Sequence, residues 1–141
     1  MKSLIYVSQE SRLLSVNDLE TLLEGAITKN KLLHITGILF YIEGIFLQYI
    51  EGPKNNIDQL YDSITKDKRH HKIKLVNTQT ITERKFSDWS MILKTLTLSE
   101  AEKILDSKVS NVENFYTTLL SDDKYILSLV NFFWERDKEI L

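Results

Sequence analysis

With 141 residues, of which 43% are hydrophobic and 27% charged, the chain is long enough for one domain with a buried core and too apolar to be disordered. Its formal net charge of -2 excludes the basic surface that nucleic-acid binding requires, and the absence of cysteine excludes disulfides, thiolate metal sites and cysteine nucleophiles. No stretch reaches the roughly 18 apolar residues of a membrane span, and the N-terminus lacks the pattern of a signal peptide, so we expect a cytoplasmic protein without a membrane partner.

A strand and an amphipathic helix are predicted first. Residues Lys2–Ser8 are rich in β-branched and aromatic side chains, which is typical of a strand. Ser15 followed by Asp18 predicts a capped helix start, and the next apolar residues follow helical spacing: Leu19, Leu22, Leu23, Ala26 and Ile27. Asn30 continues this stripe. The sequence leaves two interpretations of Asn30 open, a helix C-cap or an amide that points into a pocket at the helix end.

A hairpin, a second helix and two more strands follow. Ile35–Ile42 and Ile45–Glu51 predict strands joined by a tight turn, and Gly52-Pro53 predicts a helix with proline in its first position. The basic residues of segment 67–70 are expected to close that helix. Two further strands are then predicted over Lys72–Ile81 and Phe86–Leu93, the second with Trp89, Met91 and Leu93 on one face.

The order of these elements predicts an α+β fold. The first six match the ferredoxin-like βαββαβ pattern, in which two helices cover one sheet face and the first and third strands are neighbours, and the strand over 86–93 is an extra one. Capping boxes at Thr97/Glu100 and Ser110/Glu113 predict C-terminal helices packed on the other face. We expect residues 1–95 and 96–141 to form one compact unit. The aromatic residues 132–134 fit either intramolecular packing or a surface for an oligomer or partner.

One polar residue interrupts the apolar third strand. Gln48 shares a face with Phe46 and Ile50, and an unmatched buried polar group costs about 1–3 kcal/mol, so a fixed polar partner is expected. Tyr6 lies on the corresponding face of the neighbouring strand. We therefore predict a contact between Tyr6 and Gln48 beneath the two helices, if the register allows it. Glu51 falls on the opposite face and is interpreted as a strand-end charge.

Signals of catalysis are missing from the sequence. His34, His70 and His71 lack the spacing of a helical metal site and are interpreted as solvated or capping residues, so no metal is predicted. There is no phosphate-binding glycine loop and no nucleophile elbow. On the residues alone, two functions stay open: a small ferredoxin-like enzyme, and a ligand-sensing module that binds through Tyr6, Asn30 and Gln48.

Several motifs, in order, resemble the BLUF family of blue-light sensors that use FAD. The matching segments are Leu4–Ser8, Asn30, Ile35–Tyr41, Gly44–Pro53, Asp67–His70 and Arg84–Met91. Together they span residues 2–95. Lys29 is a departure, because many members carry asparagine or histidine there.

The resemblance implies a photoreceptor, not an enzyme, with the FAD ring inserted between the two sheet-covering helices. Asn30 would hydrogen-bond the carbonyl edge of the ring, Gln48 would face flavin N5 and O4, and Tyr6 would hydrogen-bond Gln48. Light would drive electron and proton transfer from Tyr6 through Gln48, leaving a rearranged amide, a stronger hydrogen bond to O4 and a small reversible red shift.

Further roles follow from the same resemblance. Asp67, Arg69 and His70 would lie near the cofactor, and Lys29 would reach a flavin carbonyl or phosphate or else be solvated. Trp89 and Met91 would report the change at Gln48. Because no attached effector is visible, the signal would pass to a downstream signalling protein or through a homo-oligomer.

Overall fold

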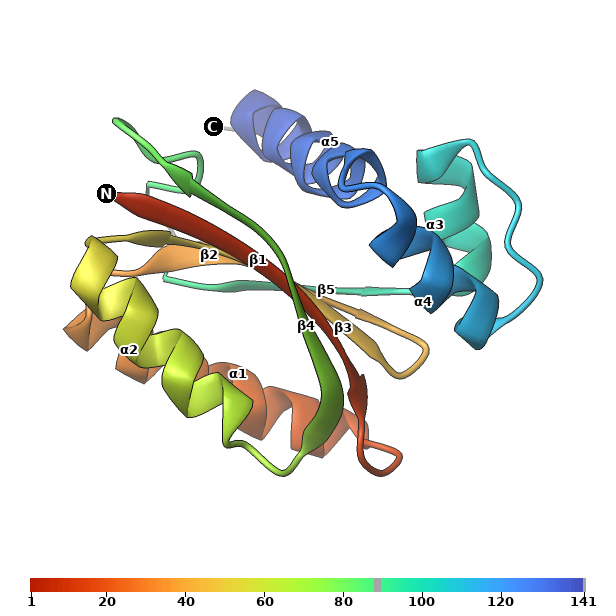
Figure 1. Ribbon diagram of the computed structural model, residues 1–141, viewed down its shortest axis with the longest axis horizontal. Helices are drawn as coiled ribbons and strands as arrows, with labels where there is room; N and C mark the ends of the chain where they lie inside the picture. Colours follow the sequence, from red (N-terminus) through yellow and green to blue (C-terminus); the bar gives the residue numbers. More distant parts are fainter. Residues whose placement is uncertain (88–89, 141) are drawn as a thin grey trace.

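The computed structural model describes residues 1–87 and 90–140, with side chains described for 1–87 and 90–136. In chain order the elements are β1 (Lys2–Glu10), α1 (Val16–Leu32), β2 (Thr36–Ile42), β3 (Ile45–Gly52), α2 (Lys54–Thr65), β4 (His70–Thr80), β5 (Ile92–Leu96), α3 (Leu98–Leu105), α4 (Val112–Ser121) and α5 (Lys124–Ile140) (Figure 1). Within these described ranges, no helix combines the length and apolar character needed to cross a bilayer.

The strands form one sheet in the order β4-β1-β3-β2-β5. β1 and β3 are antiparallel neighbours at its centre, and β5 joins β2 in parallel at one edge. Figure 1 shows α1 and α2 on one face of the sheet and α3, α4 and α5 on the other. This arrangement confirms the predicted α+β fold, with its ferredoxin-like order of the first six elements, its extra strand and its C-terminal helices on the second face.

Alternation along the strands separates two hydrophobic clusters. On β3, Phe46 and Ile50 belong to the cluster beneath α1 and α2, whereas Ile45, Leu47 and Tyr49 belong to the cluster that faces the C-terminal helices. All eight residues of β3 are buried, because both faces of this central strand are covered. A polar side chain on either face is therefore shielded from bulk water.

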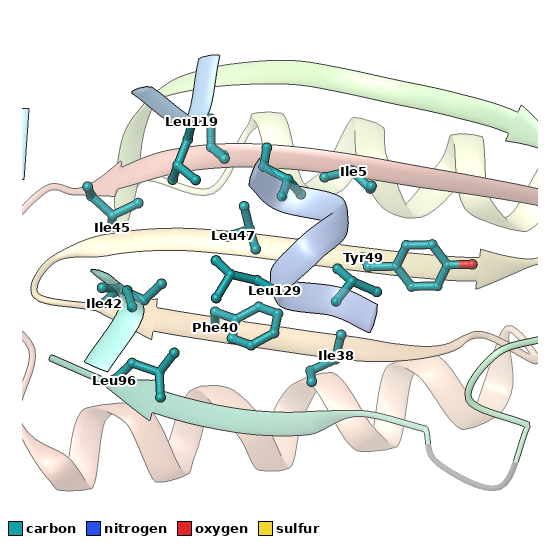
Figure 2. Close-up of a cluster of buried hydrophobic side chains, with 14 of the residues drawn as sticks. Ile5, Ile38, Phe40, Ile42, Ile45, Leu47, Tyr49, Leu96, Leu119 and Leu129 are labelled. Carbon is teal, nitrogen blue, oxygen red and sulfur yellow. The ribbon is translucent and has the colours of Figure 1, made fainter. Parts of the chain in front are cut away.

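The C-terminal helices pack on the sheet through large apolar side chains. Figure 2 shows Leu119 and Leu129 of these helices above Phe40 and Leu47 of the sheet, and the same cluster includes the fully buried Phe115. Phe133 of α5 lies against Phe40 with 5.4 Å between ring centroids. The aromatic residues of α5 thus take part in intramolecular packing, and oligomer formation stays a prediction.

The last strand begins later than the sequence predicted. β5 starts at Ile92, not at Phe86. The backbone N–H groups of Lys85 and Phe86 donate to the carboxylate of Glu51, each at 2.7 Å, instead of to a neighbouring strand. Glu51 is therefore a buried acceptor, and its interpretation as a strand-end charge is wrong. Met91 keeps its predicted place in the cluster beneath α1 and α2.

The helix ends agree with the sequence only in part. The predicted capping boxes that begin α1 and α3 are confirmed. α4 is instead capped by Asn111, so the predicted box beginning at Ser110 is wrong, since asparagine caps a helix as well as serine does. Pro53 is the N-cap of α2 and not its first helical residue. α2 ends at Thr65, so the basic residues of segment 67–70 follow the helix. His70 Nε2 lies 2.7 Å from the backbone oxygen of Ile64 in the last turn, which confirms that this segment closes the helix.

Replacing Phe115 with alanine tests the packing of the C-terminal helices on the sheet. Phe115 is 0% exposed, so Phe115→Ala should lower the free energy of unfolding by about 3–5 kcal/mol through lost burial and a cavity. Leu120→Ala in the same helix is the control: Leu120 is 40% exposed, and we expect a change below about 0.5 kcal/mol. Urea unfolding followed by circular dichroism measures both. Equal midpoints for the two variants would contradict this packing.

Candidate functional site

A cavity of about 290 Å³ lies beneath α1 and α2 against the sheet. Apolar atoms from both helices and from the sheet form most of its surface, which is a common design for small-molecule sites. Its polar and charged lining comprises Tyr6, Lys29, Asn30, Gln48, Ser63, Asp67, Arg69 and His70. The fold therefore brings together, around one cavity, the sequence-predicted residues that lie in β1, α1, β3 and segment 67–70.

Tyr6 and Gln48 meet as the sequence predicted. They are register partners in the β1–β3 pair, and each is 5% exposed. The Tyr6 hydroxyl donates to Gln48 Oε1 at 2.6 Å. Burial raises the pKa of the Tyr6 hydroxyl far above its ordinary value, and the negative charge of Asp67 raises it further. Tyr6 is accordingly a neutral phenol that keeps its proton for Gln48.

The two ends of the Gln48 amide are held with unequal strength. Its oxygen accepts the short hydrogen bond from Tyr6, whereas Nε2 donates to Met91 Sδ at 3.5 Å, and a thioether is a weak acceptor. Met91 is buried, so the sulfur lies inside the same enclosed region. Because a tyrosine hydroxyl also accepts, the amide could turn its nitrogen toward Tyr6 and still be bonded. The amide is therefore held firmly at its oxygen and weakly at its nitrogen.

Asn30 points into the cavity and does not cap its helix. α1 continues to Leu32 and its C-cap is Leu33, so the C-cap interpretation of Asn30 is wrong. Asn30 is buried, and its Nδ2 donates to the backbone oxygen of Ser90 at 2.9 Å. A primary amide has two N–H donors and an acceptor oxygen, so capacity remains for a ligand. Ser90 was missed by the sequence analysis, because a backbone carbonyl leaves no signal there.

His70 is a fixed part of the cavity wall. One ring nitrogen lies 2.7 Å from the Ile64 carbonyl oxygen and the other 2.7 Å from Ser8 Oγ. A carbonyl only accepts, so Nε2 carries a proton, and in the neutral ring Nδ1 accepts from Ser8. The ring also packs edge-on against Tyr6 with 6.2 Å between centroids. Ile64 lies in the last turn of α2, so the interpretation of His70 as a capping residue is confirmed, and its interpretation as solvated is wrong. Ser8 shares a strand face with Tyr6, a signal that could have identified it.

Charged side chains gather at the cavity beside the end of α2. Arg69 forms a fork with Asp67, with Nη2–Oδ2 at 2.5 Å and Nε–Oδ1 at 3.0 Å. These hydrogen bonds hold the pKa of Asp67 below its ordinary value, so the pair is ionised and internally balanced. Lys29 is exposed and, within residues 1–87 and 90–136, forms no ion pair or side-chain hydrogen bond. Its charge gives this lining a net positive character that suits an anionic group.

The lining fits a flat heteroaromatic ring with a charged tail. The apolar walls suit the ring faces, while the Asn30 and Gln48 amides offer both donors and acceptors to polar ring edges. Gly25 of α1 also lines the cavity, and a Cβ built there would meet no atom within 4 Å, so the helix leaves open space at this point. These features match a flavin. Trp89, the remaining site residue from the sequence analysis, lies outside the described residues.

Comparisons with known proteins agree with one another. The protein family described as BLUF, sensors of blue-light using FAD, matches residues 1–92. Photoactivated adenylate cyclase subunit beta of Euglena longa is 32% identical over 131 residues, which cover 92% of this chain and 15% of that protein. The dark-state structure of BlrB, a BLUF protein, superposes with a TM-score of 0.77 at 29% identity and covers 96% of each chain. Klebsiella pneumoniae BlrP1 with FMN and cyclic diGMP gives a TM-score of 0.63 at 27% identity, covering 86% of this chain and 35% of that one.

The protonation of Tyr6 can be tested by ultraviolet titration. Since its folded pKa is raised, the neutral phenol is favoured in the fold, and the associated stability is complete below the ordinary tyrosine pKa and declines as the pH rises above it. The native chain and Tyr6→Phe should therefore release equal amounts of tyrosinate up to about pH 10. Circular dichroism verifies that both stay folded. One additional tyrosinate in the native chain below that pH would contradict the buried, neutral state of Tyr6.

Proposed function

The chain belongs to the BLUF family, sensors of blue-light using FAD, and on that premise we propose that it signals through the hydrogen bonds of Tyr6 and Gln48 beside a bound flavin. As a member it is a flavin-based blue-light sensor, which overturns the ligand-sensing alternative. The observation that carries the proposal is the 2.6 Å contact between the Tyr6 hydroxyl and Gln48 Oε1 inside the cavity.

Residues around the cavity would hold the flavin. The free donor and acceptor capacity of Asn30 suits the carbonyl edge of the ring, and Gln48 lies across the same cavity. Lys29 and the Asp67–Arg69 pair suit the phosphates, with His70 as a fixed wall. We propose FAD as the form bound, in line with the family description, while a relative of known structure holds FMN. Extraction and chromatography of the bound flavin distinguishes the two.

When bound, the flavin supplies blue-light absorption and a strong oxidant in its excited state. The part of the protein is a proton movement and an amide rearrangement. Once Tyr6 has given up one electron, its phenol becomes strongly acidic and would pass its proton along the 2.6 Å hydrogen bond to Gln48 Oε1. Electron and proton would then return to Tyr6, leaving the Gln48 amide rearranged by rotation or by tautomerisation. Burial strengthens each of these hydrogen bonds, because the local dielectric is low. The two arrangements constitute a reversible switch and not a catalytic cycle.

The change at Gln48 would be transmitted through Met91, whose Sδ accepts a hydrogen bond from Gln48 Nε2 at 3.5 Å. Met91 immediately precedes β5, and β5 leads into α3. Trp89 has the same role in this proposal. We propose that the chain itself is not an enzyme and acts on a downstream signalling protein, with a homo-oligomer as a second route. The Euglena longa relative, which is named as a cyclase subunit, is far longer, since this chain spans 15% of it. Cytoplasmic location stays a prediction from the sequence.

Removing the amide tests the switch. Purified native chain should show a red-shifted flavin spectrum under blue light and recover in the dark. Gln48→Leu should keep the flavin, because leucine preserves the apolar wall, and should lose the normal shift, because it can neither donate nor accept. Gln79→Leu, the same change at an exposed position of β4, is the control and should photocycle normally. A native-like shift in Gln48→Leu would refute the proposed role of Gln48.

Removing the sulfur side chain tests the output route. In Met91→Ala the flavin shift should persist, since Tyr6 and Gln48 are intact, whereas the light-induced change in hydrogen exchange of α3 and α5 should disappear. Met91→Leu separates volume from sulfur, because leucine fills the space without an acceptor. If Met91→Ala keeps the full light-induced exchange difference in those helices, the signal does not pass through Met91.

A further inference from the structure

A carboxylate buried on the far side of the sheet from the cavity takes no part in the proposed switch. Glu51 follows Gln48 in β3, and alternation turns it to the opposite face. Its side chain is 0% exposed. Burying a charge is costly unless hydrogen bonds satisfy it, so the groups bound to Glu51 indicate what it is for.

Four donors surround the two carboxylate oxygens. Oε1 accepts from the Tyr49 hydroxyl at 2.9 Å and from the backbone N–H of Lys85 at 2.7 Å. Oε2 accepts from Thr36 Oγ1 at 2.9 Å and from the backbone N–H of Phe86 at 2.7 Å. An ionised carboxylate only accepts and has about four lone-pair sites, so these donors saturate it.

Arg84 also binds the end of β3 and the start of β2, next to Lys85 and Phe86. Its guanidinium donates to Thr36 Oγ1 at 3.0 Å, to the backbone oxygen of Glu51 at 3.2 Å and to that of His34 at 2.6 Å. Residues 84–86 are therefore anchored to the end of β3 and the start of β2 without belonging to the sheet.

The other end of this connection lies at the cavity. The backbone oxygen of Ser90 accepts a hydrogen bond from Asn30 Nδ2, and Met91 Sδ accepts one from Gln48 Nε2. Of the described residues between β4 and β5, 85 and 86 are thus held by Glu51, and 90 and 91 by the two amides of the candidate site. Since Gln48 and Glu51 belong to one strand, β3 carries both the switch and the anchor.

We propose that Glu51 is a positioning residue of the photosensor. By holding residues 84–86 on β3, its carboxylate fixes where Ser90 and Met91 meet the two amides of the candidate site, and so sets the rate of return from the lit to the dark state. The inference rests on the proposed function, because it requires Gln48 to switch. Glu51 does not line the cavity, so the flavin spectrum in the dark should not depend on it.

Glu51→Gln is the direct test. Glutamine keeps the size of the side chain but replaces one oxygen with an NH2 donor, which leaves either Lys85 N–H or Phe86 N–H without its acceptor. We expect normal flavin content and a normal red-shift amplitude, with dark recovery at least about threefold faster, because a loosened connection follows Gln48 over a lower barrier. A merely structural loss would lower flavin content or melting temperature and leave the recovery rate of the folded fraction unchanged.

Glu10→Gln is the matched control. Glu10 also accepts a hydrogen bond from a tyrosine hydroxyl, that of Tyr41, but it lies at the end of β1 and, among the described residues, has no bond to residues 84–91. Its recovery rate should stay within about twofold of the native rate. This variant separates loss of a carboxylate bonded to a tyrosine hydroxyl from loss of this anchor.

The outcomes distinguish the two proposals. A flavin-loaded native chain without any light-induced shift overturns the proposed function. A normal native photocycle together with native-rate recovery in Glu51→Gln overturns the positioning role. If Glu51→Gln does not fold, hydrogen exchange of the native chain is the test. The backbone amides of Lys85 and Phe86 should exchange far more slowly than the amide of the exposed Glu83. Equal exchange rates would show that Glu51 does not hold these amides, and would overturn the positioning role.

Discussion

A primary amide within a strand buried on both faces constrains everything around it. Gln48 is only 5% exposed, so the protein supplies most of the partners for its donors and its acceptor. Tyr6 supplies a strong one and Met91 a weak one, at 2.6 Å and 3.5 Å. Because the tyrosine hydroxyl both donates and accepts, a turned amide could still be bonded to Tyr6 through Nε2, but Oε1 would then need a donor that the Met91 thioether cannot supply. The Gln48 amide is thus held strongly at one end and weakly at the other, and the proposed switch uses this asymmetry.

The proposed switch of the Gln48 amide requires that the other side chains around it stay in place. His70 is fixed through both ring nitrogens, and Asn30 is fixed to the Ser90 backbone. Buried apolar side chains, among them Leu39, Phe46 and Leu60, form another part of the wall, and packed interiors shift between discrete arrangements and do not deform smoothly. Met91 is the exception, since an unbranched thioether side chain adapts to irregular space. The softest neighbour of the Gln48 amide is thus the one next to β5.

How much of the fold and of the candidate site could be predicted from the sequence depends on how far apart in the chain the interacting residues lie. Alternation and strand order predicted the pairing of Tyr6 with Gln48, because both depend on the backbone pattern alone. The anchor at Glu51 could not be predicted, since its carboxylate captures backbone N–H groups 34 and 35 residues away, which also delayed the start of β5. The environment of His70 was missed for the same reason: Ser8, 62 residues distant, reaches it only in the folded chain.

The cavity and the C-terminal helices lie on opposite faces, so the proposed signal would have to cross the sheet to reach those helices. Lys85 shows how it could cross without deforming the packed strands. Its backbone N–H binds Glu51, while its ammonium binds Asn131 Oδ1 of α5 at 2.9 Å and lies 4.8 Å from the centre of the Trp134 ring. In the segment between β4 and β5, Met91 therefore contacts Gln48 at the cavity, and Lys85 contacts both Glu51 and α5. A displacement at Met91 that strains this connection would reach α5 along the chain itself, and the strength of the Glu51 anchor would decide how much of the displacement arrives.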